Sequence, residues 1–273
     1  MEKSEIRKPV VAGQFYPASK EELKRQIAGF IVKQADKLDA FACMLPHAGY
    51  VFSGAVAAET VSQINIKDKI ILLGPNHTGY GSAFSIMTKG TWQTPLGEIR
   101  IDSDLARQIL KKSKYLADDS TAHLYEHSLE VELPILQYFK SDFEIVPIVV
   151  SSQDIAALKE IGRELASAIK ESKAQGRTLL VASSDMTHYE PQDQAQKKDE
   201  EAIKAILELN EDRLTQKVQS LDISMCGYAP VVVTLAAAKV LGAGNAKLVK
   251  YQTSGDVTGD NRAVVGYAGI IIY

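Results

Sequence analysis

The sequence predicts an α/β fold with a mostly parallel central sheet flanked by helices on both faces. Short apolar runs typical of buried strands alternate with helix-compatible segments over nearly the whole chain. The chain has 273 residues, 45% of them hydrophobic, which is enough to bury a substantial core. No Pro/Ser-rich linker, low-complexity tract or internal repeat interrupts the pattern. We therefore expect a single domain over residues 1–273.

The individual elements follow from the same pattern. Apolar runs predict buried strands at residues 41–46, 69–73, 143–150 and 178–182. Helix-compatible composition lies at residues 53–64, 104–112, 126–139 and 154–172. The C-terminal third adds helices at 195–209 and 229–241 and β-rich runs at 247–253 and 263–272. Strands that alternate with helices in this way are typical of a parallel sheet.

Composition excludes several classes of protein. The 31 Lys and Arg residues against 34 Asp and Glu give a net charge of −3, which argues against general nucleic-acid binding. We find no apolar signal segment, and the longest apolar run, near residues 228–241, is too short and polar to span a bilayer. Two cysteines, Cys43 and Cys226, form no disulfide framework. We expect a cytosolic protein with reduced thiols and no membrane partner.

Histidines carry the functional signal. Of only five, His47, His77 and His188 each follow a predicted strand, and His127 opens the helix predicted at 126–139. Ligands of open α/β sheets bind beyond the carboxyl ends of the strands. A single histidine there is more often a structural hydrogen-bonding residue, but three at one edge favour a functional site.

A thiol completes the pattern of a transition-metal site. Imidazoles with a thiolate or carboxylate suit Fe, Zn and Cu. Cys226 precedes a predicted helix whose dipole would favour the thiolate, so it is a candidate third ligand; the alternative is a small buried core residue. Cys43 lies inside a strand run, and we interpret it as core.

Asp185 and His188 lie three residues apart after the predicted strand at 178–182. They suit an acid–base pair or groups that support a metal ligand. Asp185 equally suits a side-chain cap of a turn, and both interpretations stay open.

Six ordered motifs resemble those of one family. They are RKPVVAGQFYP (7–17), PHAGY (46–50), GPNH (74–77), EHSLE (126–130), SDMTHY (184–189) and CGY (226–228). The chain is similar to the Memo family, also called AmmeMemoRadiSam system protein B. That family resembles the class III, LigB-type extradiol dioxygenases, which bind non-heme Fe(II) through two histidines and a glutamate.

The resemblance implies a site. His47 and His77 take the two histidine-ligand positions, and Cys226 takes the third position in place of the glutamate. Asp185 and His188 then line the same pocket, with His127 as a further member. Thiolate ligation changes the redox behaviour of iron and also admits Cu or Zn. The family's second name implies AMMECR1-like and radical-SAM partner proteins.

Three functions remain to be compared. The first is metal-dependent redox or oxygen-linked chemistry on an unknown small molecule, with Fe(II) as the metal. The second is a non-catalytic module that binds phosphate or a phosphopeptide through imidazoles, Arg7 and the backbone N–H groups of residues 74–81. The third is a hydrolase with Cys226 as nucleophile beside His188 and Asp185. It is the least favoured, because it gives the other histidines no role.

Overall fold

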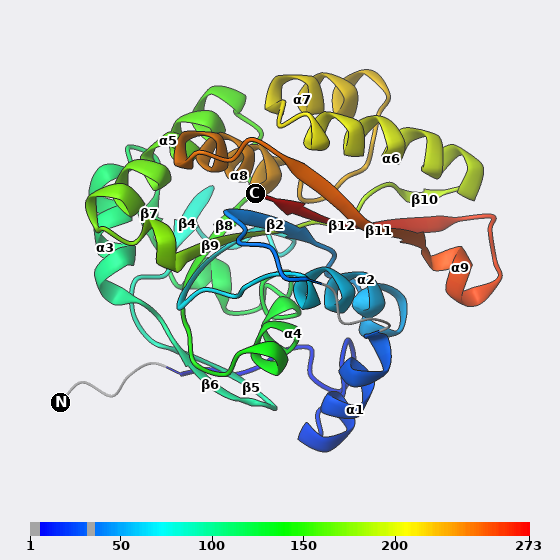
Figure 1. Ribbon diagram of the computed structural model, residues 1–273, viewed down its shortest axis with the longest axis horizontal. Coiled ribbons are helices and arrows are strands. Elements are labelled where there is room, and N and C mark those ends of the chain that lie inside the picture. Colours follow the sequence, from blue (N-terminus) through cyan, green and yellow to red (C-terminus); the bar gives the residue numbers. More distant parts are fainter. Residues whose placement is uncertain (1–5, 32–35) are drawn as a thin grey trace.

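A nine-stranded sheet forms the centre of the computed structural model, which describes residues 6–31 and 36–273 (Figure 1). Its strands are β2 (Ala42–Leu45), β3 (Lys69–Pro75), β4 (Phe84–Ile86), β7 (Ala117–Asp118), β8 (Glu144–Val150), β9 (Thr178–Ser183), β10 (His188–Glu190), β11 (Ala246–Thr253) and β12 (Val264–Ile272). They lie in the order β10-β12-β2-β9-β3-β8-β4-β7, and β11 also pairs with β12.

The centre of the sheet is parallel, antiparallel pairs flank it on both sides, and the edge strand β7 pairs in parallel with β4. Strands β2, β9, β3 and β8 pair in parallel, whereas β12 runs antiparallel to β2 and β4 antiparallel to β8. All residues of β2 and β9 are buried, as expected for strands covered on both faces. The predicted fold class is confirmed, and the antiparallel pairs on either side of the parallel centre are an addition that the strand pattern did not predict.

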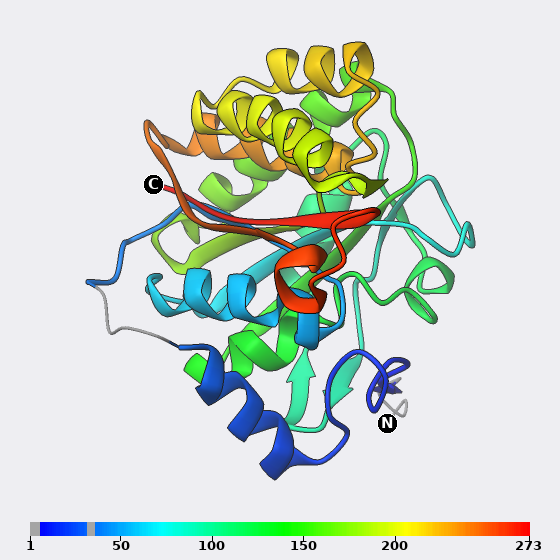
Figure 2. The same cartoon turned by 90° about the vertical axis from the view of Figure 1, so that its right-hand side faces the viewer.

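Helices cover both faces of the sheet. They are α1 (Lys20–Phe30), α2 (Tyr50–Ser62), α3 (Ser103–Lys112), α4 (Glu132–Phe139), α5 (Ile155–Glu171), α6 (Gln192–Leu207), α7 (Glu211–Ser220), α8 (Tyr228–Leu241) and α9 (Ser254–Thr258), with short 3₁₀ turns at Thr121–His123 and Gln175–Arg177. Figure 2 shows α5 to α8 above the sheet and α1, α2 and α4 below it. Helix α8 is apolar almost all round because it lies between the sheet and α5.

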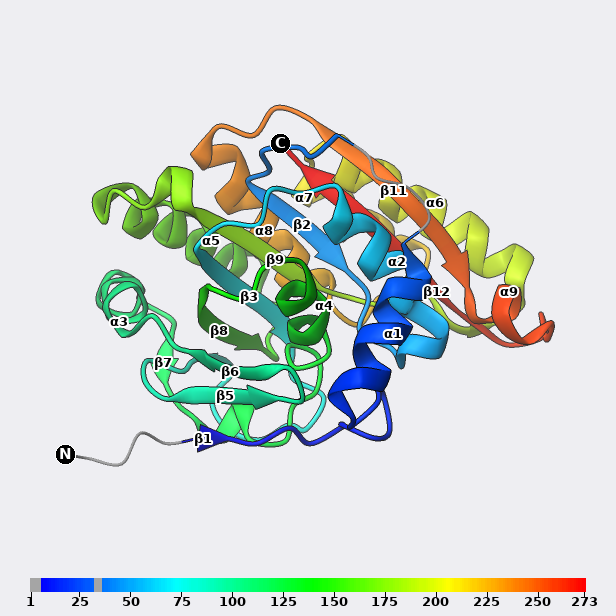
Figure 3. The same cartoon turned by 60° about the horizontal axis from the view of Figure 1, so that its bottom comes forward.

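A second, three-stranded sheet was not predicted. It consists of β1 (Ile6–Arg7), β5 (Thr91–Thr94) and β6 (Gly97–Arg100) in the order β1-β5-β6. Figure 3 shows it on the side of the molecule where the chain begins. The Arg7 guanidinium lies 4.2 Å from the ring centre of the buried Trp92. This sheet fixes the start of the chain beside the 126–130 segment.

The helix predicted at 126–139 begins only at Glu132, so the expectation that His127 opens it is wrong. Two carboxylates before the helix accept hydrogen bonds from other segments. Glu126 accepts the backbone N–H of His77, and Glu130 accepts that of Val10. These contacts hold residues 126–131 as a turn.

One apolar cluster extends from Tyr16 to Ile272 and includes the fully buried Cys43, as predicted for a core cysteine. Among the residues that the structure describes, no helix is long and apolar enough to cross a membrane. The single domain stays a prediction.

Candidate metal centre

Three neighbouring strands deliver the predicted site residues to one edge of the sheet. Strands β2, β9 and β3 end at Leu45, Ser183 and Pro75, two residues before His47, Asp185 and His77 respectively. A cavity of about 790 Å³ opens at this edge. Its lining includes all six residues that the sequence singled out: His47, His77, His127, Asp185, His188 and Cys226.

Two histidines and the cysteine converge in this cavity. Cys226 Sγ lies 3.3 Å from His47 Nε2, and the ring centres of His47 and His77 are 5.2 Å apart. One ligand atom from each of the three residues lies within 4.8 Å of the other two. The arrangement therefore has the spacing and the donor types of a transition-metal site.

His77 is backed by a carboxylate that the sequence prediction missed. Its Nδ1 lies 2.9 Å from Glu126 Oε1, which leaves Nε2 for a ligand. Burial opposes ionisation of Glu126, but hydrogen bonding and the charge of His77, with the N–H of Ser128, lower its pKa to about 2. A carboxylate behind a metal-binding histidine fixes the ring and raises its basicity. Glu126 stands in the EHSLE motif, but only His127 received a role.

His47 is backed by a hydroxyl and is only 2% exposed. Its Nδ1 lies 2.7 Å from Ser183 Oγ, which in turn lies 2.9 Å from Glu132 Oε1. Burial, and after it the nearby rings of His77 and His127, lowers the pKa of His47 well below its ordinary value. Burial also raises the pKa of Glu132 well above its ordinary value. Both shifts favour the uncharged forms of His47 and Glu132.

A glycine sets the position of Cys226. A Cβ atom on Gly227 would lie 2.3 Å from the carbonyl oxygen of Ser183, so only glycine lets this segment approach β9. The backbone N–H of Asp185 donates to Cys226 Sγ at 3.3 Å. Burial, followed by the charge of Asp185, raises the pKa of the thiol. The helix dipole alone does not produce the expected thiolate; a bound cation would have to displace the proton.

Asp185 and His188 lie on the same wall but do not form the expected direct pair. His188 Nδ1 lies 2.8 Å from Met186 O and 2.9 Å from Ser224 O, so two carbonyls orient the ring. Asp185 accepts the backbone N–H groups of His47 and Ala48. Burial raises its pKa to about 6, against the lowering effects of His188 and these N–H groups. Asp185 thus caps the turn after β2 and also faces the cavity.

His127 lies over the open side of the cluster. Its ring stacks on His77 with centres 4.7 Å apart and meets Phe15 edge-on at 4.9 Å. Burial lowers its pKa, against the raising effect of Glu126. His127, His77 and Glu126 also bring ligand atoms within 4.8 Å of one another, but Glu126 already binds His77 Nδ1.

Arg7 does not face the cavity. It is 3% exposed and forms an ion pair with Glu130, while its Nε donates to His123 O and its Nη2 to Glu126 O. Glu130 also accepts the Tyr16 hydroxyl at 2.7 Å. This network anchors the N-terminal segment that contributes Phe15 to the cavity wall.

In the loop that follows β3, most backbone N–H groups already donate hydrogen bonds within the protein. Asn76 Oδ1 accepts the N–H groups of Thr78 and Gly79, and Glu126 accepts that of His77. These amides and Arg7 were the expected anion donors, so an anion in this cavity would meet chiefly imidazoles.

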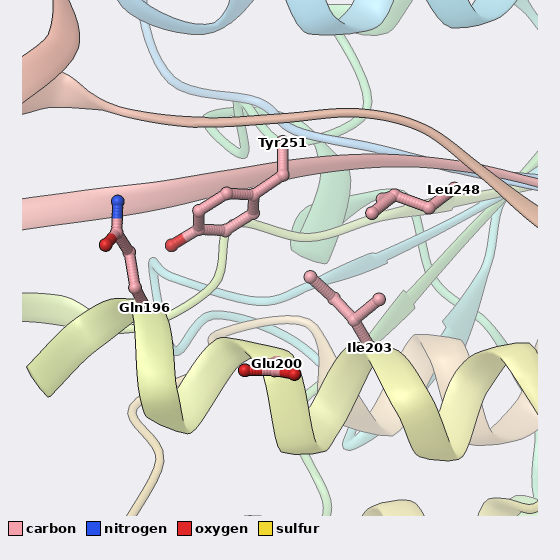
Figure 4. A pocket seen from close by; sticks show the side chains of 5 residues that line it. All are labelled: Gln196, Glu200, Ile203, Leu248 and Tyr251. Atoms are coloured by element: carbon pink, nitrogen blue, oxygen red, sulfur yellow. The ribbon is translucent and has the colours of Figure 1, made fainter. Parts of the chain in front are cut away.

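A second concavity, of about 270 Å³, lies between α6 and β11 (Figure 4). Gln196, Glu200 and Ile203 line it from the helix, and Leu248 and Tyr251 from the strand. The Tyr251 hydroxyl donates to the buried Asp199 at 2.7 Å. This lining contains no histidine or cysteine, so the metal-ligand chemistry belongs to the cavity at the strand ends.

Fold and site together define an α/β protein whose sheet edge carries a cluster of metal-ligand residues. The chain belongs to the Memo-like protein family, whose model matches residues 7–271. It is 46% identical to a MEMO1 family protein of Aquifex aeolicus, over 97% of this chain and 98% of the relative. A MEMO1 family protein of Methanopyrus kandleri is 43% identical over the same shares. The predicted family is confirmed.

A solved structure shares the fold. It is an uncharacterized protein of Escherichia coli K12, aligned with a TM-score of 0.55 over 83% of this chain and 98% of that one. The two sequences are 16% identical, so the likeness shows the fold alone.

Proposed function

We propose that the chain binds one transition metal ion through His47 Nε2, His77 Nε2 and Cys226 Sγ and uses it in redox or oxygen-linked chemistry on a small molecule. One observation carries the proposal: these ligand atoms converge while the Nδ1 atom of each histidine is held from behind. Donors around one ion at 2.0–2.3 Å lie about 3–4 Å apart. The spacing therefore fits a single ion after small side-chain shifts.

The donor set suits Fe(II), and it also admits Cu or Zn. The similarity of the Memo family to LigB-type dioxygenases supports iron, with Cys226 in place of a carboxylate ligand. A bound iron ion supplies one-electron redox chemistry and Lewis acidity. Three protein ligands leave coordination positions open toward the cavity.

The chain's own residues then handle the substrate and its protons. His188 presents Nε2, because its Nδ1 faces two carbonyls. That nitrogen can exchange a proton with a molecule in the cavity. Asp185, with a pKa of about 6, is a second group that changes charge near neutral pH. His127 covers the His77 ring and narrows access to it.

The other two functions have less support. The anion-binding hypothesis counted on Arg7 as a donor, but Arg7 is buried in an ion pair with Glu130. In a hydrolase, Cys226 would need His188 as its base, but its sulfur faces His47 Nε2 at 3.3 Å. We retain two predictions: a cytosolic location, which rests on the composition and cysteine content of the sequence, and association with AMMECR1-like and radical-SAM proteins, which rests on the resemblance alone.

Elemental analysis of protein purified without oxygen tests the proposal. We expect about one transition metal ion per chain, and loss of tight binding in His47→Ala, His77→Ala and Cys226→Ala, because each leaves too few donors. Cys43→Ala is the matched control, since it removes a buried thiol that is not part of the ligand cluster and should keep the metal. Equal metal content in the wild type and the His47→Ala/His77→Ala double variant would refute this site. A metal-free wild type that binds inorganic phosphate would favour the anion-binding module.

A further inference from the structure

A buried chain of polar groups lies behind His47 and has no part in the chemistry proposed above. Ser183 Oγ lies 2.7 Å from His47 Nδ1, 2.8 Å from Ser128 O and 2.9 Å from Glu132 Oε1. Ser183 and Glu132 are both 0% exposed. The three contacts share one hydroxyl group, and this restricts where the protons sit.

A hydroxyl group has one proton to donate and two lone pairs that accept. The carbonyl of Ser128 can only accept a hydrogen bond, so the Ser183 hydroxyl donates its one hydrogen to that oxygen. For the other two contacts to be hydrogen bonds, His47 must donate from Nδ1 and Glu132 must donate from a protonated carboxyl group. No other arrangement makes hydrogen bonds of all three contacts.

The surroundings of Glu132 agree with a neutral acid. In the described part of the chain, no cation forms an ion pair with it, and its Oε2 has no hydrogen-bond partner. An ionised carboxylate in such a place would be very costly, whereas a protonated one that donates to Ser183 is tolerable.

The consequence concerns the ligand atom. A neutral imidazole carries its proton on one nitrogen only. With that proton on Nδ1, the lone pair of His47 lies on Nε2, which faces Cys226 Sγ at 3.3 Å. The opposite tautomer would place a proton where the ion is to bind.

We propose that Ser183 and Glu132 are positioning residues that hold His47 in its Nδ1–H tautomer, so that Nε2 is ready for a metal ion before any ion arrives. The proposal rests on the proposed function, because it assigns this pair a purpose at the same site. The Ser183 oxygen accepts a hydrogen bond from His47 Nδ1–H, and the hydrogen bond from the Glu132 acid keeps the Ser183 hydroxyl hydrogen directed at Ser128 O.

Histidine NMR on the metal-free protein tests the proton placement directly. Two-bond ¹H–¹⁵N spectra distinguish the two tautomers, and the His47→Asn variant identifies the His47 signals. We expect Nδ1–H in the wild type and a mixture of tautomers in Ser183→Ala. A wild-type proton on Nε2 would overturn the proposal.

Anaerobic titration with Fe(II) tests the consequence. Ser183→Ala should bind about 10–100-fold more weakly, the usual effect of removing a group that orients a metal ligand. Glu132→Leu should lower the affinity for Fe(II). Glu132→Gln should keep most of that affinity, because an amide N–H can donate to Ser183 in place of the acid. Ser85→Ala is the control: it removes a buried strand hydroxyl that contacts Asp119 O, away from the cluster.

The outcomes separate this proposal from the proposed function. If His47 carries Nδ1–H and the wild type still binds no Fe(II), the metal site is wrong and the proton placement stands. If the wild type binds Fe(II) and Ser183→Ala binds equally tightly with an unchanged tautomer, the positioning role is wrong. If Ser183→Ala does not fold, the wild-type spectrum still tests the tautomer of His47. The comparison of Glu132→Gln with Glu132→Leu then tests the positioning role.

Discussion

The two histidines of the cluster are held in opposite ways. In the His47 half, formed by His47, Ser183 and Cys226, the ring is 2% exposed and its partner is an uncharged hydroxyl. In the His77 half, formed by His77, Glu126 and His127, the His77 side chain is 33% exposed and its partner is an ionised carboxylate.

The difference separates two ways in which a partner can support a metal-binding histidine: it can fix the position of the ring, or it can raise the basicity of the ring. A dry, uncharged surrounding fixes the His47 ring but adds nothing to its basicity. A carboxylate partner raises the basicity of His77 and, being ionic, tolerates partial exposure.

The largest expected effect lies outside both halves. His188→Ala should lower the rate of oxygen consumption with a reductant about 10²–10⁴-fold and leave the metal in place, because the role we propose for His188 is to exchange protons and not to hold the ion. Iron content and oxygen uptake are measured on the same samples. A variant that loses iron as His47→Ala does would make His188 a ligand, whereas full activity would remove its proton role.

The next effect sharpens the His77 half. Glu126→Gln should weaken Fe(II) binding about 10–100-fold, because a neutral amide no longer raises the basicity of the ring. Glu164→Gln is the control, since Glu164 is a buried carboxyl group that bonds Ser113 on the far side of the fold. Unchanged affinity in Glu126→Gln would mean that the two halves do not differ as described.

Two glycines lie in close contact with residues that support the cluster. Gly227→Ala should cost about 1–3 kcal/mol of unfolding free energy, as overpacking usually does, and should displace Cys226 from His47. Gly74→Ala should disturb residues that support both halves, because its Cβ would lie 2.6 Å from Leu129 Cδ2 and 2.7 Å from Ser128 Oγ. The Ser128 N–H donates to Glu126, and its carbonyl accepts from Ser183. Gly244→Ala meets nothing within 4 Å and should change neither stability nor metal content. Chemical denaturation and iron analysis check all three.

The last effect is a pH slope, which is about tenfold for each pH unit. The Cys226 thiol, whose pKa is raised, must lose its proton when the ion binds. Metal affinity should therefore rise with pH by about tenfold per unit between pH 6 and 8, all below the pKa of the thiol. Cys43→Ser should keep this slope. A flat profile in the wild type would mean that Cys226 binds no metal.

Local pattern predicted most of the elements correctly. The apolar runs at 69–73 and 178–182 became β3 and β9, and the run at 229–241 became α8. It failed at 126–139, where the first turn of the predicted helix is absent. There, hydrogen bonds of Glu126 and Glu130 to distant backbone amides outweigh local helix propensity.

The sequence by itself indicated the parallel core and placed His47 and His77 at one sheet edge, because each histidine directly follows an apolar strand run and parallel strands end at the same edge. The tertiary structure alone decided the partners behind each ring. Ser183 lies 136 residues from His47, and Glu126 lies 49 from His77. No local spacing encodes such contacts, since they arise only when strands and turns pack. The identity of the site residues could therefore be predicted from the sequence, but their protonation states and charges could not.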